Sequence, residues 1–330
     1  MYRLRLCARL TTKLCKPQDT VPVYHRNISR WIRPTLIELT HRKKRWHKPI
    51  RSPRNEFIEW NREAEVYAFN NRLSEKFDLN LLERAFTHRS YVIQEEEEQK
   101  KVGIDNPMLD FEDNLELISE GKEITPLLIE NYLHSALPLA PLECIHAFKN
   151  YLLSNEVLAA TSSGIGTKDL VLTQEYPVDE ETLANTFYAL ISALNRSVNL
   201  EHAGIFVRDI LISRLAEKDL IELWSPENPL EILNDILIRE SRKEAEPRVI
   251  AQTGINTLLP VYHIAVYSNK EFLGSGIGET VDEGVSLAAL NALLRMFGLL
   301  DSSNPLRCNL KIDEPDSKNL PLQEWSRSKI

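Results

Sequence analysis

The stretch NLELISEGKEI, residues 114–124, decides the fold class of this chain. It is expected to form a helix, which places Glu116 and Glu120 four residues apart on one helical face. Two carboxylates that point the same way repel each other. Such a pair therefore needs either a cation between the two carboxylates or exposure to solvent. The surrounding sequence helps to decide between these two explanations.

The segments on both sides of this stretch also carry helical patterns. Apolar residues recur at helical spacing over 56–76, 79–92, 182–194 and 204–215, and strand-like alternation is absent before residue 224. The run QEEEEQKK, 94–101, fits a solvated helix end or loop. We therefore predict one all-helical domain over residues 56–224.

The pattern changes after SPENP, residues 225–229, which has two prolines and no apolar side chain. A helical segment is followed by three strand-like segments and a closing helix over 279–300. The segment GSGIG, 274–278, is interpreted as a turn at a strand end, because a phosphate loop would need a helix directly after it. We predict a helix–strand–strand–strand–helix domain over 225–301, with one sheet face under two helices, and a polar tail without a core over 302–330.

Charge is distributed unevenly along the chain. Residues 1–62 hold 16 Lys and Arg against 4 Asp and Glu, whereas the remainder holds 24 against 44. The first segment, MYRLRLCARLTTKLCK, combines basic, hydroxyl and apolar residues with no acid, which is typical of a mitochondrial presequence. We predict a presequence and a basic arm over residues 1–55, with a disordered basic start as the alternative.

The arm contains a second basic run, HRKKRWHKPIRSPR, at 41–54. Such a run can neutralise phosphates, and Trp46 could stack on a base. It could equally be presequence that is removed on import. The candidate RNA-binding residues of this arm are Arg42, Lys43, Lys44, Arg45, Lys48, Arg51 and Arg54.

Two further classes of feature are not expected. No run of about 18 apolar residues occurs, so we predict no membrane span. Cys7, Cys15, Cys144 and Cys308 are too scattered for a zinc site or a disulfide framework, which fits a reducing compartment.

Three segments, in order, resemble the ribonuclease III family. LLERAFTHRSY (81–91) resembles the opening of its nuclease domain, NLELISEG (114–121) its signature helix, and TLANTFYALISAL (182–194) a later helix. The second domain resembles a double-stranded RNA-binding domain, which also follows the nuclease domain in that family. The resemblance covers about residues 79–301 and implies a mainly helical fold with a small α+β domain.

The resemblance implies a magnesium-dependent endoribonuclease whose metal is held by four acids on two helices. Glu116 and Glu120 match two of these positions, whereas Asn185 and Tyr188 stand at the other two. Magnesium prefers charged oxygen ligands, and a tyrosine with an ordinary pKa near 10 is neutral. We therefore predict a pseudo-nuclease with no catalytic residue, metal or cofactor, and place Glu116 and Glu120 on a solvated or partner-facing surface. His88 is predicted to cap or pack a helix.

The RNA-binding-like domain departs from its family as well. Such domains contact duplex phosphates with a lysine pair at the start of the last helix, where Asp282 and Glu283 stand here. Residues 226–301 hold 6 basic against 11 acidic residues. We predict weak phosphate tracking by this helix, with Arg248 and Asn256 as candidate RNA contacts and protein docking as a further use of the fold.

Together, these features resemble the ribonuclease-III-like proteins of the mitochondrial ribosome. The resemblance implies a structural component of the large subunit in the mitochondrial matrix, bound to large-subunit ribosomal RNA and neighbouring ribosomal proteins. It also allows pairing with a ribonuclease-III-like dimer partner. Two alternatives stay open: an active double-strand-specific endoribonuclease with magnesium as its cofactor, and a free RNA-binding adaptor.

Overall fold

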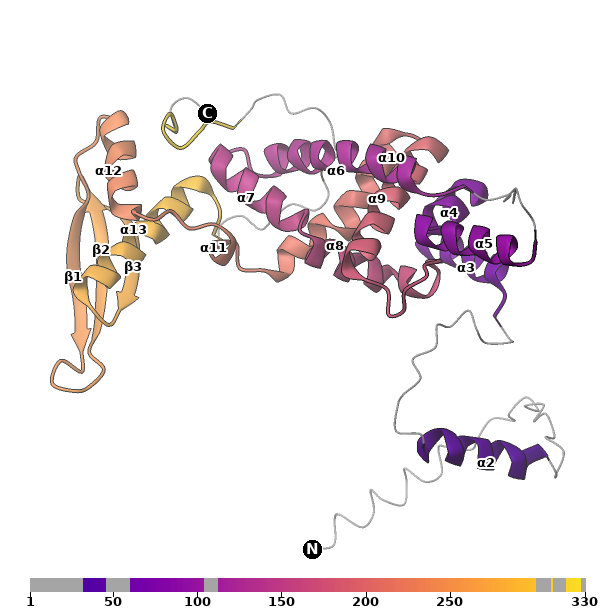
Figure 1. The fold of residues 1–330 in the computed structure, drawn as a ribbon. Coiled ribbons are helices and arrows are strands. Elements are labelled where there is room, and N and C mark those ends of the chain that lie inside the picture. Colours follow the sequence, from indigo (N-terminus) through magenta and orange to yellow (C-terminus); the bar gives the residue numbers. More distant parts are fainter. Residues whose placement is uncertain (1–31, 46–59, 104–111, 301–309, 311–318, 328–330) are drawn as a thin grey trace, which may run out of the picture. The chain divides into compact units, whose positions relative to one another are not determined.

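The computed structural model describes residues 32–45, 60–103, 112–300, 310 and 319–327. The chain divides into two units, Met1–Arg51 and Ser52–Ile330. The described part of the first unit is helix α2 (Ile32–Arg45) (Figure 1). A search of the described helices finds none with the length and apolar character needed to cross a membrane.

The second unit begins with a domain made of helices, and the predicted mainly helical fold is confirmed. Helix α3 ends at Leu73 rather than at 76, because Ser74 adopts a left-handed backbone with φ of 57°. The α-helices are α3 (Arg62–Leu73), α4 (Leu79–Phe86), α5 (Arg89–Lys101), α6 (Leu115–Ala136), α7 (Leu142–Leu152), α8 (Asn155–Ile165), α9 (Glu180–Ser197), α10 (Leu200–Ile210) and α11 (Leu220–Leu223), with 3-10 helices at Thr167–Asp169 and Ile212–Glu217.

Helix α9 forms the centre of this domain. Helices α4, α6, α8 and α10 pack against it, and its side chains are buried on nearly every face between Leu183 and Leu194. A helix that is apolar all round belongs inside a core. Phe187 of α9 stacks on Phe206 of α10 with ring centroids 6.2 Å apart. The helix that carries Glu116 and Glu120 is thus packed against the most buried element of the domain.

The second domain has the predicted helix–strand–strand–strand–helix order. It consists of α12 (Pro229–Arg239), β1 (Glu246–Thr253), β2 (Val261–Ser268), β3 (Glu271–Gly278) and α13 (Val281–Phe297). The strands form an antiparallel sheet in the order β1-β2-β3, and α13 packs on β2 and β3 (Figure 1). Ile264 and Val266 of β2 lie in the core between sheet and helices.

The segment GSGIG lies inside β3, so its interpretation as a turn is wrong. Its glycines, Gly274, Gly276 and Gly278, alternate along the strand and face α13. A β-carbon at Gly274 would come within 2.6 Å of the Ala292 backbone nitrogen. These glycines therefore let α13 approach the sheet more closely than side chains would permit.

Residues 319–327 form what we call the C-terminal clasp, and the prediction of a tail without a core is wrong for them. Trp325 is fully buried, and its ring meets Phe297 of α13 edge-on with centroids 4.8 Å apart. Arg239 of α12 donates to the Trp325 carbonyl at 2.9 Å. Trp325, together with the partly buried Leu320 and Leu322, supplies the apolar surface that the polar composition of the tail conceals.

The clasp also binds the helical domain. The Asn319 side chain donates to the Leu137 and Ala140 carbonyls, each at 2.7 Å, and the Trp325 indole donates to the Leu139 carbonyl at 2.8 Å. The Asn319 carboxamide oxygen lies 2.8 Å from a ring nitrogen of the buried His134. The clasp therefore connects the α6–α7 corner of the helical domain to α12 and α13.

Candidate functional site

The N-terminal end of α6 is fixed by the residue that precedes it. Asn114 is fully buried, its backbone N–H donates to the Thr87 carbonyl at 3.2 Å, and its side chain donates to the Ala85 carbonyl at 3.2 Å. This anchoring sets the first turns of α6 with Glu116 and Glu120 toward α9. Their side chains are 55% and 37% exposed.

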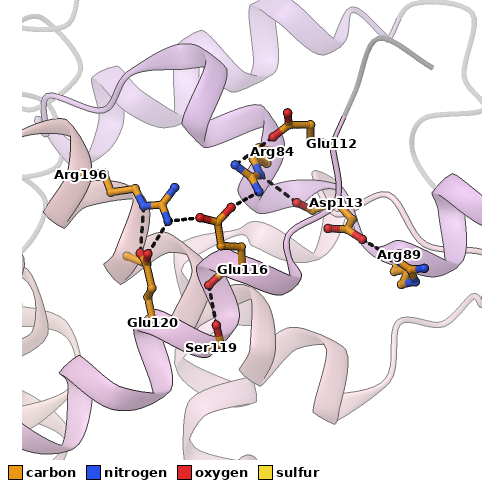
Figure 2. Close-up of polar contacts among 9 residues, drawn as sticks. Arg84, Arg89, Glu112, Asp113, Glu116, Ser119, Glu120 and Arg196 are labelled. Carbon is orange, nitrogen blue, oxygen red and sulfur yellow. Dashed lines mark hydrogen bonds and ion pairs between the residues drawn. The ribbon is translucent and has the colours of Figure 1, made fainter. Parts of the chain in front are cut away.

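A cation lies between the two carboxylates, and it is a guanidinium of this chain. Arg196 of α9 donates to Glu116 at 2.7 Å through Nη2 and to Glu120 at 2.9 Å through Nε, and its Nη2 also contacts the other Glu120 oxygen (Figure 2). The Ser192 hydroxyl donates to Glu120 at 2.7 Å. The predicted solvated surface is present, since both acids are partly exposed, but the prediction missed that both acids are paired within the domain.

Glu116 has a second arginine partner. Arg84 of α4 donates to Glu116 at 2.6 Å, to the Asp113 carbonyl at 2.9 Å, and forms an ion pair with Glu112 at 2.9 Å (Figure 2). We call Arg84, Glu116, Glu120, Ser192 and Arg196 the arginine–carboxylate cluster. It joins α4, α6 and α9.

The cluster favours the charged forms of Glu116, Glu120 and Arg196. Hydrogen bonding from Arg196 is the largest influence on both acids and holds the pKa of Glu116 and of Glu120 below the ordinary value of 4.5. Arg84 acts in the same direction on Glu116, while partial burial opposes the lowering at Glu120. The two carboxylates in turn raise the pKa of Arg196. All three groups are therefore ionised at neutral pH.

The other two family positions lie on α9. Tyr188 is 8% exposed and packs against Gly121 of α6, and Lys122 Nζ lies 5.9 Å from the centre of its ring. Burial raises the pKa of the Tyr188 hydroxyl, so that it is neutral at working pH. Asn185, three residues earlier, is half-buried.

These side chains do not fit a magnesium ion. Magnesium requires near-octahedral oxygen ligands, of which carboxylates are the usual protein donors. Here Arg196 and Ser192 donate to the oxygens that face α9, and Asn185 and Tyr188 add no negative charge. Among the residues that the structure describes, no three His, Cys, Asp or Glu side chains gather as a metal site would require.

Sequence reasoning missed the residues that pair with the acids, namely Arg84, Ser192 and Arg196. A signal for two of them was present: Tyr188, Ser192 and Arg196 are spaced by four and so share one face of α9. That face meets α6, and the two helices run in opposite directions there. Tyr188 therefore lies against Gly121, Ser192 against Glu120, and Arg196 against Glu116.

The structure describes only part of the predicted RNA-binding arm. Arg42 is exposed on α2 and pairs with Glu38 one turn away at 3.3 Å. An exposed pair of this kind is weak and competes little with phosphate. Lys43, Lys44 and Arg45 continue the backbone of α2, but their side chains are not among the described parts, and Lys48, Arg51 and Arg54 lie outside the described residues.

Arg248 and Asn256 both belong to the RNA-binding-like domain. Arg248 of β1 pairs with Glu246 at 2.8 Å and lies 5.6 Å from the centre of the Tyr267 ring. Asn256 is exposed in the loop between β1 and β2, close to the fully exposed Leu258. The structure thus places one candidate within interactions of its own sheet and the other on an open loop.

Asp282 and Glu283 have a structural reason to be acidic. The Thr280 hydroxyl accepts from the Glu283 backbone N–H at 3.2 Å, and the Glu283 carboxylate accepts from the Glu279 N–H at 3.1 Å. Reciprocal bonds of this type cap a helix, and negative charge in the first turn suits the helix dipole. The start of α13 is therefore built for helix stability.

Two family profiles match this chain in the order of its domains. The profile of the endonuclease domain of large ribosomal subunit protein mL44 matches residues 61–194, and the profile of the MRPL44 dsRNA-binding domain matches residues 224–328. The second match includes the C-terminal clasp.

Two individual relatives carry the same family name. The chain is 29% identical over 305 residues to large ribosomal subunit protein mL44 of Caenorhabditis elegans, covering 91% of this chain and 74% of the relative. It is 27% identical to the mL44 protein of Neurospora crassa over 36% of this chain and 26% of that protein. The nuclease domain of ribonuclease III from Campylobacter jejuni is 17% identical with a TM-score of 0.37, over 45% of this chain and 96% of that one. The chain belongs to the mL44 family of ribonuclease-III-like proteins.

Proposed function

We propose that this chain is a structural component of the large subunit of the mitochondrial ribosome and supports mitochondrial translation from the matrix. The observation that carries the proposal is the Arg196 guanidinium between Glu116 and Glu120, in a chain of the mL44 family. The nuclease position has become an internal ion cluster that holds helices together. The helical domain thus has a structural role in this proposal, in place of metal-dependent catalysis.

Its partners are large-subunit ribosomal RNA and neighbouring ribosomal proteins. The basic arm, including the exposed Arg42, supports contact with phosphates. The acidic start of α13 would repel the phosphates of double-stranded RNA. It therefore supports a role for the second domain in binding neighbouring proteins. Pairing of the helical domain with a ribonuclease-III-like partner is part of the same proposal.

A sucrose gradient of mitochondrial lysate tests the proposal, run with and without EDTA to separate the ribosomal subunits. We expect the chain to migrate with the large subunit in both conditions. A chain that stays near the top of the gradient would contradict a built-in ribosomal role and favour a free RNA-binding adaptor.

A nuclease assay tests the pseudo-nuclease part separately. Purified full-length chain is incubated with duplex RNA and magnesium, beside the variants Glu116→Ala and Glu120→Ala. We expect no cleavage above background from any of the three proteins. Cleavage by the unaltered chain that is lost in both variants would show that the acids still serve catalysis.

A further inference from the structure

The arginine–carboxylate cluster places its positive charge between two helices that come from distant parts of the sequence. Arg196 lies 76 residues from Glu120 and 80 from Glu116 along the chain. Its side chain is 28% exposed, and those of Glu116 and Glu120 are 55% and 37% exposed, so the contacts form at the solvent edge of the packing between α6 and α9. The charge therefore acts on the packing of α6 against α9.

The chemistry of a guanidinium suits this position. Its planar fork carries five N–H donors and remains charged at any pH at which the domain is folded. One such group can therefore satisfy oxygens of two carboxylates at once. Without it, Glu116 and Glu120 would face each other across one helical turn, and Arg84 would offset the charge of Glu116 but not that of Glu120.

We propose that Arg196 is a built-in countercation that takes the place of a divalent metal ion between Glu116 and Glu120 and makes the packing of α6 on α9 independent of magnesium. The site that would hold a dissociable ion in a metal-dependent nuclease is closed by a side chain that cannot leave. This inference concerns the internal structure of the domain and holds whether or not the chain is a ribosomal component.

Thermal unfolding of the full chain tests the proposal. The proteins compared are the unaltered chain, Arg196→Ala, Glu116→Gln/Glu120→Gln, and the triple variant that combines them. Each is measured in EDTA and in magnesium chloride at matched ionic strength. The matched control is Arg89→Ala, which removes an exposed arginine that pairs with one acid, Asp113, at 2.7 Å.

We expect the midpoint of the unaltered chain to be the same in EDTA and in magnesium. Arg196→Ala should lower the midpoint in EDTA by about 2–4 °C, and magnesium should restore part of that loss. In the Glu116→Gln/Glu120→Gln background, Arg196→Ala should lower the unfolding midpoint much less, and magnesium should not change that midpoint. Arg89→Ala should change little in either buffer.

Three results would overturn the proposal. The first is an equal cost of Arg196→Ala with and without the two carboxylates, because Arg196 would then act through packing alone. The second is a rise in the midpoint of the unaltered chain with magnesium. The third is an Arg196→Ala protein with no magnesium response, since the proposal requires that a divalent cation can stand in for the missing guanidinium. Arg196→Lys provides a milder variant that keeps the charge, and it should retain the insensitivity to magnesium.

Discussion

Gly121 of α6 lies against the backbone of Tyr188 in α9, so that a β-carbon at position 121 would come within 2.6 Å of the Tyr188 carbonyl carbon. Backbone atoms inside two packed helices cannot move aside as a flexible side chain can. The glycine therefore sets the separation of the two helices that carry the arginine–carboxylate cluster.

Gly121→Ala should destabilise the domain. Overpacking of a tight core contact costs about 1–3 kcal/mol, which exceeds the gain in helix propensity of up to about 1 kcal/mol. The free energy of unfolding, measured with a chemical denaturant, checks this. Gly164→Ala in α8 is the control, because its β-carbon would meet only the end of the Arg214 side chain at 3.2 Å. That variant should be neutral or stabilised, and a similar loss in both would contradict the steric explanation.

His88 should make stability depend on pH. It caps α5 by accepting from the Ser90 N–H at 3.3 Å, as the sequence predicted, and burial is the largest cause that lowers its pKa below 6.5. The unfolded chain therefore binds a proton more readily than the folded chain. We expect the His88 contribution to be complete above pH 6.5 and to decline as the pH falls through 6.5, the ordinary value.

The measurement is the free energy of unfolding as a function of pH for the unaltered chain and for His88→Asn. Asparagine is a good N-cap and does not titrate. The free energy of unfolding of the His88→Asn variant should fall less steeply on the acid side of neutrality than that of the unaltered chain. Parallel curves for the two proteins would show that His88 does not contribute to the pH dependence.

Trp325→Ala should open the C-terminal clasp. Truncation of a fully buried tryptophan costs about 3–5 kcal/mol, and here it also removes the indole bond to Leu139. We expect faster proteolysis of residues 319–327 and faster hydrogen exchange in α12 and α13. Glu324→Ala, an exposed neighbour in the same segment, should leave both unchanged. Unaltered exchange in Trp325→Ala would mean that the clasp contributes nothing to the second domain.

Asp282→Lys should strengthen binding of duplex RNA. The change removes one negative charge and adds one positive charge at the start of α13, and it leaves the bond between Thr280 and Glu283 in place. One new phosphate contact should steepen the salt dependence of the binding constant by about one unit of slope. Glu201→Lys on α10 makes the same change of charge elsewhere. Equal gains in the two variants would indicate a general charge effect with no role for the position in α13.

The sequence predicted what depends on local pattern and order. The helical domain, the helix–strand–strand–strand–helix domain and the capping role of His88 all follow from periodicity or from motifs within a few residues. The pairing of Glu116 and Glu120 on one face was also evident. These features are determined by neighbours along the chain, which a sequence displays directly.

The partners of those side chains could not be predicted in the same way. Arg196 meets the acids across 76–80 residues of intervening chain, and its role depends on how α6 crosses α9. Trp325 lies in a polar segment, and only its burial against Phe297 shows that it belongs to a core. The glycines of GSGIG have turn-like composition, yet their function is to admit a helix. Each of these features depends on packing between distant elements.

The C-terminal clasp has a consequence for the order in which the molecule matures. Its bonds join residues 182 and 186 positions apart, from Asn319 to Leu137 and from Trp325 to Leu139. Contacts of such long range are reached late in folding, because the closure of a large loop has to precede any gain from them. During synthesis, residues 319–327 are also made after every other described element. Both domains can therefore acquire their own cores first, and the fixed arrangement between them is completed last.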